Sequence, residues 1–242
     1  MSRYFITGTD TDAGKTCISS ALLIQAQQQG LSAFGLKPIA AGYASADELT
    51  AAGFSSLPAK VNLDALLLQA TSQPRYALSL HNPWCFQDPL SPHLAAKHHG
   101  VTLTLEQLTQ ACLHNLETAD AAFNLIEGAG GWRVPFHAEQ TLDALAVALD
   151  LPVILVVGLR LGCLNHALLT AQAIAHSGCR LAGWVANQID PHQQAAAENI
   201  DFLRQHFDRQ GVPCLGVVPH LAALSPLERA EQAASYLQLP AG

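Results

Sequence analysis

Short runs of apolar residues, separated by longer amphipathic stretches, are the dominant pattern along this chain. The runs lie at 3–7, 33–38, 122–126, 152–157, 181–186 and 215–218. Within each run the apolar residues follow one another rather than alternating with polar ones, which is typical of parallel strands covered on both faces. The pattern therefore predicts strands that lie in the interior of the protein.

Between most of these runs the apolar positions recur with helical spacing. The predicted helices lie at 17–29, 104–119, 140–149, 165–177, 192–209 and 226–238. Thr102 or Thr104 is the expected N-cap of the second helix, because a threonine oxygen can accept a backbone N–H of the first turn. Two segments lack such a pattern. The segment 42–60, rich in Ala, Ser and Gly, is expected to be a surface loop, and the proline-containing 72–101 an irregular excursion.

Strands that alternate with helices predict an α/β fold. The fold class we expect is a doubly wound, mostly parallel sheet with helices on both faces, and such sheets bind ligands at the carboxyl ends of their strands. Nothing along the sequence marks a domain boundary, so we expect a single domain over 1–242.

The segment from Gly8 to Thr16 lies between the first predicted strand and the first predicted helix and is similar to a phosphate-binding loop. It leaves five residues between Gly8 and Gly14, whereas the pattern G-x-x-x-x-G-K-[ST] has four. Gly14, Lys15 and Thr16 still supply backbone N–H groups for phosphates, an ammonium for the β/γ oxygens and a hydroxyl for Mg²⁺. The carboxylates and hydroxyls of 9–12 favour a loop shaped for a second ligand as well. The alternative is an ordinary helix-capping turn.

Polar residues also follow several of the other predicted strands. Glu127 ends one of them and stands where a nucleotide site places its second, acidic metal ligand. The glycines of the following Gly128-Ala129-Gly130 would let the backbone approach an anion closely. A solvated strand-end glutamate is the alternative. Asp64 opens a helical pattern, and its spacing by itself favours an N-cap over a metal ligand.

Two further strand ends carry candidate ligands. Lys37 ends the second predicted strand, where a second cation would neutralise charge on a transferring phosphoryl group. A surface lysine is the alternative. Asn187, followed by Gln188, ends the run at 181–186. Because an asparagine amide can pair with N6 and N7 of adenine, it favours ATP over GTP. A turn asparagine is the alternative.

Composition narrows the range of partners. The net charge is −7, and the 12 Lys and Arg residues form no cluster. These features argue against nucleic acid and against an anionic membrane surface as partners. The six cysteines form no C-x-x-C pair, the apolar runs are too short to cross a bilayer, and the N-terminus does not resemble a signal peptide. We therefore expect reduced thiols and a cytoplasmic protein.

Taken together, several blocks resemble the dethiobiotin synthetase family. They are the loop 8–16, the segments Gly35–Pro38, Asp88–His93, Glu127–Gly131 and Val153–His166, and Val185–Asn187. The resemblance runs from residue 2 to about residue 221. It implies an ATP-dependent cyclo-ligase of biotin biosynthesis with Mg²⁺ as cofactor, and a homodimer. Its substrates would be diaminopelargonate, CO₂ and ATP, which pass through a carbamate and a mixed carbamic–phosphoric anhydride to a cyclic urea.

The resemblance also implies roles for individual residues. Lys15 and Lys37 would neutralise the γ-phosphoryl and carbamate oxygens, and Thr11 would touch the diamine or carbamate. Mg²⁺ would be held by Thr16, Asp64 and Glu127. The expected ATP-binding set is Asp12, Ala13, Gly14, Lys15, Thr16, Cys17, Asp64, Glu127, Gly128, Ala129, Gly130, Asn187, Gln188, Pro219, His220 and Leu221. The segment with Leu161, Gly162, Cys163 and Asn165 would bind the substrate's carboxylate tail at the start of a helix, across the dimer interface.

The chain departs from the family pattern at three places. Ala41 stands at a substrate-contact position where a hydroxyl residue is common, Asp12 replaces a longer glutamate, and the segment 42–64 is longer than usual. Two other classes of protein remain as alternatives. One is a phosphate-loop ATPase of the partitioning or switch type, although this loop lacks the early lysine of partitioning ATPases. The other is a non-catalytic nucleotide-binding module, which would not need the second cation at Lys37.

Overall fold

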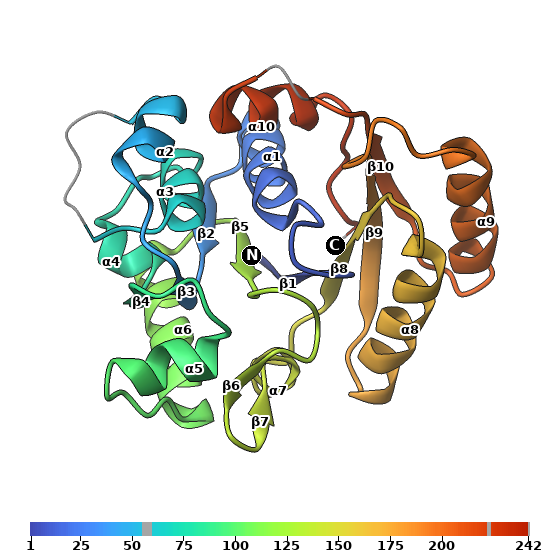
Figure 1. Ribbon diagram of the computed structural model, residues 1–242. Coiled ribbons are helices and arrows are strands. Elements are labelled where there is room, and N and C mark those ends of the chain that lie inside the picture. Colours follow the sequence, from blue (N-terminus) through green and yellow to red (C-terminus); the bar gives the residue numbers. More distant parts are fainter. Residues whose placement is uncertain (55–59, 222–223, 242) are drawn as a thin grey trace.

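The predicted strands form one parallel sheet. A computed structural model describes residues 1–54, 60–221 and 224–241. Its largest sheet has the order β10-β9-β8-β1-β5-β2 (Figure 1). The strands are β1 (Ser2–Gly8), β2 (Ala33–Leu36), β5 (Phe123–Glu127), β8 (Val153–Gly158), β9 (Leu181–Asn187) and β10 (Cys214–Val218). All pairings in this sheet are parallel, so the predicted fold class is confirmed.

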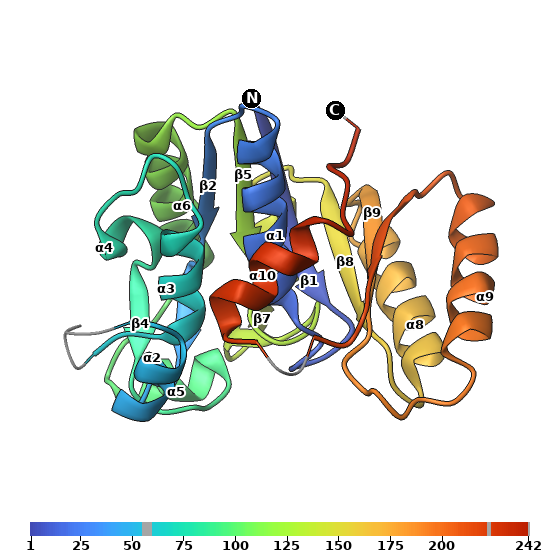
Figure 2. The same cartoon turned by 90° about the horizontal axis from the view of Figure 1, so that it is seen from above.

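Helices cover both faces of this sheet. Figures 1 and 2 show α1 (Lys15–Gln28) and α10 (Pro226–Ala234) lying together on one face. The opposite face carries α6 (Leu105–Ala119), α7 (Asp143–Ala148), α8 (Cys163–His176) and α9 (Ala196–Asp208). The chain order reverses at β1, which has β5 and β2 on one side and β8, β9 and β10 on the other. Such a switch point opens a crevice at the carboxyl ends of the strands.

Successive residues of each strand pack into the hydrophobic cores on opposite faces of the sheet. In β1, Tyr4 and Ile6 pack with α1 and α10, whereas Phe5 packs with residues of α6 and α7. In β8, Ile154 joins the α1 side and Leu155 the side of α8 and α9. Because side chains alternate between the faces of a strand, a strand covered on both faces is apolar at most positions instead of at every second one. This burial explains the continuous apolar runs in the sequence.

Two of the sequence predictions were wrong. The segment 42–60 contains a helix, α2 (Ala46–Ala51), which begins with a capping box between Ser45 and Glu48. Its residues 55–59 lie outside the described part. The segment 72–101 contains α4 (Leu78–His81), β4 (Trp84–Phe86) and α5 (Pro92–His98). These elements are too short to show a hydrophobic period, and β4 exists through its pairing with the distant β3 (Ile39–Ala41).

Helix boundaries also differ from the sequence prediction. Residues 140–141 of the predicted helix 140–149 belong to β7 (Gln140–Thr141), which pairs with β6 (Pro135–His137). The helix α9 begins at Ala196 rather than at 192, and α10 ends at Ala234 rather than at 238. Thr104, one of the two expected caps, is the N-cap of α6, with Gln107 completing a capping box.

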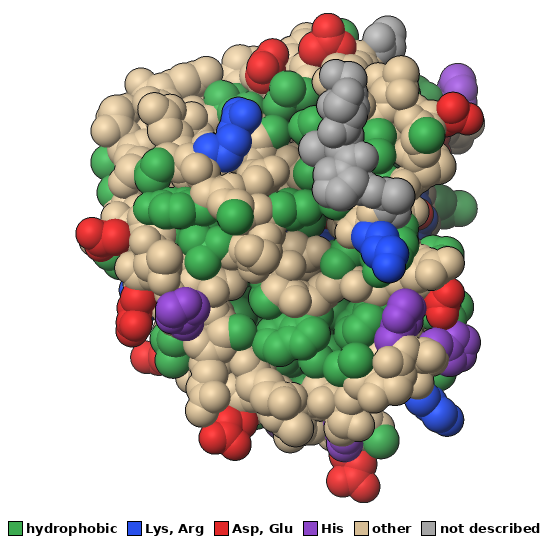
Figure 3. Space-filling view, turned by 90° about the vertical axis from the view of Figure 1, so that its left-hand side faces the viewer, with side chains coloured by type: hydrophobic (Ala, Val, Ile, Leu, Met, Phe, Trp, Pro, Cys, Tyr) green, Lys and Arg blue, Asp and Glu red, His purple; other side chains and the backbone are tan. Residues whose placement is uncertain are grey.

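The described residues on the side seen in Figure 3 form no large charged area. Apolar side chains gather near the centre of this face, and charged ones lie apart from one another, mostly towards its margin. Within the described ranges, every helix is too short or too polar to cross a bilayer.

Candidate active site

A cavity of about 940 Å³ lies at the carboxyl ends of the sheet strands. Residues that end or follow four strands line it: Lys37 after β2, Ala129 after β5, Asn187 at the end of β9 and Pro219 after β10. The predicted site residues that line it are Thr11, Asp12, Gly14, Lys15, Thr16, Cys17, Lys37, Ala41, Asp64, Ala129, Gly130, Asn187, Gln188, Pro219, His220 and Leu221. The fold therefore gathers residues that are far apart in the sequence around one cavity.

The loop from β1 to α1 has the backbone of a phosphate loop. Gly14 is the N-cap of α1, with φ +88°, and Asp12 also adopts a left-handed conformation, with φ +60°. A glycine cap has no side chain with which to satisfy the first N–H groups of the helix, and such N–H groups bind phosphates. Asn187 donates from Nδ2 to the carbonyl of Ala13 at 2.9 Å. The end of β9 is thereby joined to the loop.

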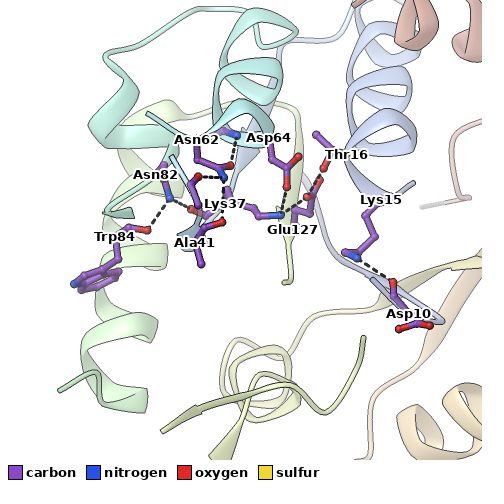
Figure 4. Close-up of polar contacts among 12 residues, drawn as sticks. Asp10, Lys15, Thr16, Lys37, Ala41, Asn62, Asp64, Asn82, Trp84 and Glu127 are labelled. Carbon is purple, nitrogen blue, oxygen red and sulfur yellow. Dashed lines mark hydrogen bonds and ion pairs between the residues drawn. The ribbon is translucent and has the colours of Figure 1, made fainter. Parts of the chain in front are cut away.

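Lys15 is a buried cation at the floor of the cavity. Its Nζ donates to the carbonyl oxygen of Asp10 at 3.3 Å (Figure 4). Burial and the nearby charge of Lys37 lower the pKa of Lys15 to about 8, although Glu127, Asp64 and Asp12 oppose the shift. A bound polyanion would favour the charged form, so the ammonium of Lys15 is suited to hold phosphate oxygens.

Lys37 lies at the centre of a charged cluster (Figure 4). Its Nζ is 2.5 Å from Oε1 of Glu127 and 3.0 Å from Oδ2 of Asp64. The hydroxyl of Thr16 donates to the same Oε1 of Glu127 at 2.8 Å. The side chain of Glu127 is fully buried, whereas that of Asp64 is 43% exposed towards the cavity. The cluster thus joins α1, β2, α3 (Leu63–Ala70) and β5.

The charges of this cluster stabilise one another. Burial alone would lower the pKa of Lys37, but the charges of Asp64 and Glu127 and their hydrogen bonds outweigh it and raise the pKa above its usual value. Burial would raise the pKa of Asp64, but the charge and hydrogen bond of Lys37 and the hydroxyl of Thr16 lower it. At neutral pH Lys37 is therefore a cation and Asp64 an anion.

The oxygen atoms in this cluster fit a hard divalent cation. The second carboxylate oxygen of Glu127, Oε2, is buried without a hydrogen-bond partner among the described residues. The hydroxyl of Thr16 donates to the other oxygen of this carboxylate, Oε1, and Lys37 joins that same oxygen to the carboxylate of Asp64. The described residues contain no group of three or more His, Cys, Asp or Glu side chains that could hold a metal, and this site offers two carboxylates. One or two carboxylates with a hydroxyl suit Mg²⁺, which also binds waters and phosphates.

Residues outside the predicted set hold Lys37 and Asp64 in place. The backbone N–H of Lys37 donates to the carbonyl of His81, and its carbonyl accepts from Nδ2 of Asn82, both at 2.7 Å. Asn62 is the N-cap of α3 and donates to the carbonyl of Gly42 at 2.9 Å. The interpretation of Asp64 as an N-cap was therefore wrong, since the cap lies two residues earlier. Asn62 precedes the apolar pattern of α3 directly, and because asparagine is a favoured N-cap, its position could have indicated the cap.

Some predicted residues do not line this cavity. Ala13 is buried, and Glu127 and Gly128 line a small adjoining pocket together with Ala129. The predicted tail-binding residues are Leu161, Gly162, Cys163 and Asn165, and all lie outside the cavity lining. Gly162 is the N-cap of α8, and Leu161 beside it is 97% exposed.

Comparison with known proteins agrees with this fold. A family model described as an AAA domain matches residues 2–228. The ParA family ATPase of Chlorobium tepidum has a TM-score of 0.53 at 10% identity, covering 97% of both chains. The MinC:MinD complex of Aquifex aeolicus also gives 0.53, at 11% identity over 96% of this chain and 86% of the other. At such low identity the likeness concerns the fold alone. The chain is a phosphate-loop nucleotide-binding protein of the AAA-domain class.

Curated relatives define the family more narrowly. Two proteins named "ATP-dependent dethiobiotin synthetase BioD" match almost end to end. The one from Chromohalobacter salexigens is 47% identical, covering 99% of both chains. The one from Cellvibrio japonicus is 46% identical, covering 98% of this chain and 95% of the relative. The chain belongs to the dethiobiotin synthetase family, the ATP-dependent ligases of biotin biosynthesis.

Proposed function

We propose that the cavity carries out the complete ring closure of dethiobiotin with the residues described above. One amine of diaminopelargonate adds to CO₂ and loses a proton, which gives a carbamate. A carbamate oxygen attacks the γ-phosphorus of ATP, and ADP leaves. The second amine then attacks the carbonyl carbon of the mixed anhydride, phosphate leaves and a proton is lost, which completes the cyclic urea.

The observation that carries this assignment is the placement of two lysines on one cavity. Lys15 belongs to the phosphate loop, and Lys37 follows the next strand of the sequence, yet both line the same space. Nucleotide binding by itself needs one of them, whereas transfer of a phosphoryl group to a carbamate gathers negative charge from two substrates. Lys37 also pairs with Asp64 and Glu127, and their charges raise its pKa, so it would act as a fixed cation.

Each substrate would have its own side of the loop. The backbone of 12–17 would hold the triphosphate, and Thr11 would face the diamine or carbamate. Asn187, Gln188 and the segment 219–221 would hold the adenine. Ala41 lines the cavity near Lys37 but has no hydroxyl to offer the diamine. The backbone of 128–130 would approach the nucleotide beside Glu127.

Magnesium would be held by Thr16, Asp64 and Glu127. Oε2 of Glu127 supports this assignment, because it is buried with no hydrogen-bond partner among the described residues, and such an oxygen costs free energy until a cation or a donor satisfies it. When bound, Mg²⁺ supplies positive charge to the β- and γ-phosphate oxygens. The chain's own contribution is to fix the oxygen ligands, which Lys37 does by pairing with both carboxylates.

A homodimer would complete the diamine site. Leu161, just before the N-cap of α8, is 97% exposed, and Leu169, further along the same helix, is 56% exposed, so α8 presents apolar side chains to the solvent. A second copy covering this surface would place the N-terminus of α8, with Gly162, Cys163 and Asn165, against the substrate's carboxylate tail. This arrangement would explain why these residues lie outside the cavity of one copy.

The proposal is tested by following phosphate release from ATP with Mg²⁺ and bicarbonate, with and without diaminopelargonate. We expect release to depend on the diamine and a cyclic urea to accumulate in equal amount, as measured by mass spectrometry. Phosphate release that ignores the diamine would instead indicate an ATPase of the partitioning or switch type.

A further inference from the structure

Side chains fasten the phosphate loop to the ends of two neighbouring strands. At the C-terminal side of the loop, Asn187 of β9 holds the carbonyl of Ala13. At the N-terminal side, Thr9 accepts a hydrogen bond from the N–H of Gly158, the last residue of β8, at 3.3 Å. Arg160, two residues further on, forms an ion pair with the carboxylate of Asp10 through its Nη2. Both ends of the loop are therefore held by residues at the carboxyl ends of β8 and β9.

Asp10 also forms hydrogen bonds with two residues of the site, Thr11 and Lys15. Its other carboxylate oxygen, Oδ1, accepts the backbone N–H of Thr11 at 2.8 Å. Its backbone carbonyl accepts the ammonium of Lys15 at 3.3 Å (Figure 4). Asp12, which follows, has a positive φ of 60°, a conformation that aspartate adopts more readily than most non-glycine residues. A displacement of Asp10 would therefore displace Thr11 and Lys15 together.

Arg160 also belongs to the turn that begins α8. Its backbone carbonyl accepts the N–H of Cys163 at 3.0 Å, and Gly162 between them has a φ of +93°. One residue thus takes part in two structures: its side chain holds the phosphate loop, and its backbone shapes the N-terminus of α8. Under the proposed function, the phosphate loop binds ATP and the reacting diamine, and the N-terminus of α8 binds the carboxylate tail of the diamine.

We propose that Arg160 is a positioning residue, which acts through Asp10 to set Thr11 and Lys15 relative to the start of α8. The identity of the second ligand in this statement rests on the proposed function, whereas the coupling between Arg160 and the phosphate loop does not. Arg160 is absent from the lining of the cavity and need not touch either substrate.

Because the ion pair between Arg160 and Asp10 is partly exposed, its effect on the position of the loop can be distinguished from its effect on the stability of the fold. The side chains of Arg160 and Asp10 are 40% and 45% exposed, and ion pairs so exposed contribute little to folding. Misplacement of reacting groups by an ångström, in contrast, can reduce turnover strongly. A role in positioning therefore predicts a large effect on turnover with a small effect on the melting temperature.

The experiment compares Arg160→Ala, Arg160→Lys, Asp10→Asn and the double variant Asp10→Asn/Arg160→Ala in the full chain. Each is measured for kcat, KM for ATP and for diaminopelargonate, ATP affinity by calorimetry, and melting temperature. Arg204→Ala is the matched control, because Arg204 also forms an exposed pair with an aspartate, Asp201, but on α9, remote from the loop.

We expect Arg160→Ala to lower kcat about tenfold or more, while the melting temperature matches that of Arg204→Ala. Arg160→Lys should restore part of the loss, and the double variant should be no worse than Arg160→Ala, because both changes break one interaction. Losses that multiply in the double variant would overturn the proposal. If Arg160→Ala raised only the KM for diaminopelargonate and Asp10→Asn did not, the proposal would also be overturned, because Arg160 would then bind the substrate directly.

If the unaltered chain released no diamine-dependent phosphate, the proposed function would be wrong. The ATP affinities of the same variants would still test the coupling between Arg160 and the phosphate loop.

Discussion

A Cβ atom on Gly14 would lie 2.0 Å from Nδ2 of Asn187. That distance is far shorter than any non-bonded contact, and the Asn187 amide can move away only by breaking its hydrogen bond to the carbonyl of Ala13. The positive φ of Gly14 adds a second demand for glycine. The glycine of the loop is therefore fixed both by its own backbone and by a residue from the other half of the chain.

Gly14→Ala should reduce ATP affinity sharply, because the new methyl group must displace Asn187 from the loop. It should also lower stability by more than the roughly 1–2 kcal/mol that a left-handed conformation costs an alanine. Calorimetric titration with ATP and thermal unfolding measure the two effects. Gly30→Ala is the control, since Gly30 has a φ of +78° but no atom within 4 Å of its added Cβ. Wild-type ATP affinity in Gly14→Ala would contradict the steric argument.

Lys37→Ala should lower turnover by about two to three orders of magnitude, the range seen when a preorganised group that stabilises developing charge is removed. ATP binding should largely survive, because Lys15 and the loop remain. Steady-state kinetics and ATP calorimetry test this expectation. An equal loss of ATP binding would make Lys37 a nucleotide anchor rather than a catalytic cation.

The same substitution should also destabilise the fold, by about 3–5 kcal/mol, because it leaves the fully buried carboxylate of Glu127 without its cation. Lys37→Met/Glu127→Gln removes both charges and should recover much of this stability in urea unfolding without recovering turnover. Lys97→Ala, on the exposed side of α5, is the control and should change neither quantity.

Removal of divalent metal with a chelator should stop phosphate release, and added Mg²⁺ should restore it. Thr16→Val, which keeps the shape of the side chain but loses its hydroxyl, should raise the Mg²⁺ concentration needed for half-maximal turnover by about tenfold or more. Thr16→Ser keeps the hydroxyl and should behave like the unaltered chain. If Thr16→Val required no additional Mg²⁺, the hydroxyl would serve only its hydrogen bond to Glu127.

His81 should make the fold sensitive to acid. Its Nδ1 lies 2.7 Å from the carbonyl oxygen of Gly35 and must carry the proton, while Nε2 is buried without a partner among the described residues. Burial lowers the pKa of His81, the hydrogen bond to Gly35 opposes the shift, and the charge of Arg75 adds to it.

Because the unfolded chain then binds a proton more readily than the folded one, the stability that His81 contributes is present above its unfolded pKa of about 6.5 and declines as the pH falls below that value. Urea unfolding between pH 7.5 and 5 should show a decline that His81→Gln lessens. His98→Gln, at an exposed histidine, is the control. An identical decline in His81→Gln would place the acid sensitivity elsewhere.

The main sheet and the phosphate loop were predictable from the sequence because their signals are local. A strand buried on both faces carries a nearly continuous run of apolar residues, so β1, β5 and β8 could be recognised without any partner. The loop was recognisable because the residues that bind phosphate are neighbours along the chain, and Gly14 both ends the loop and caps α1.

The short elements could not be predicted in the same way. The helix α2 spans only Ala46–Ala51, and β4 spans Trp84–Phe86. Neither is long enough to display a hydrophobic period, and β4 depends on a partner strand more than forty residues away. Asn62 was missed because Asp64 was considered as the cap of this helix, whereas the hydrogen bond from the N–H of Ala65 shows that Asn62 is the cap.

The sequence alone determined which residue types this protein offers to its ligands: a phosphate loop with Lys15 and Thr16, and acidic, basic and amide side chains at the strand ends. The tertiary structure decided how they combine. It placed Lys37 between Asp64 and Glu127, buried one oxygen of Glu127 away from any hydrogen-bond partner in the described ranges, and joined Arg160 to Asp10. The physical reason is that backbone preferences and burial act on neighbouring residues, whereas ion pairs and hydrogen bonds between distant segments depend on the register and order of the strands that carry them.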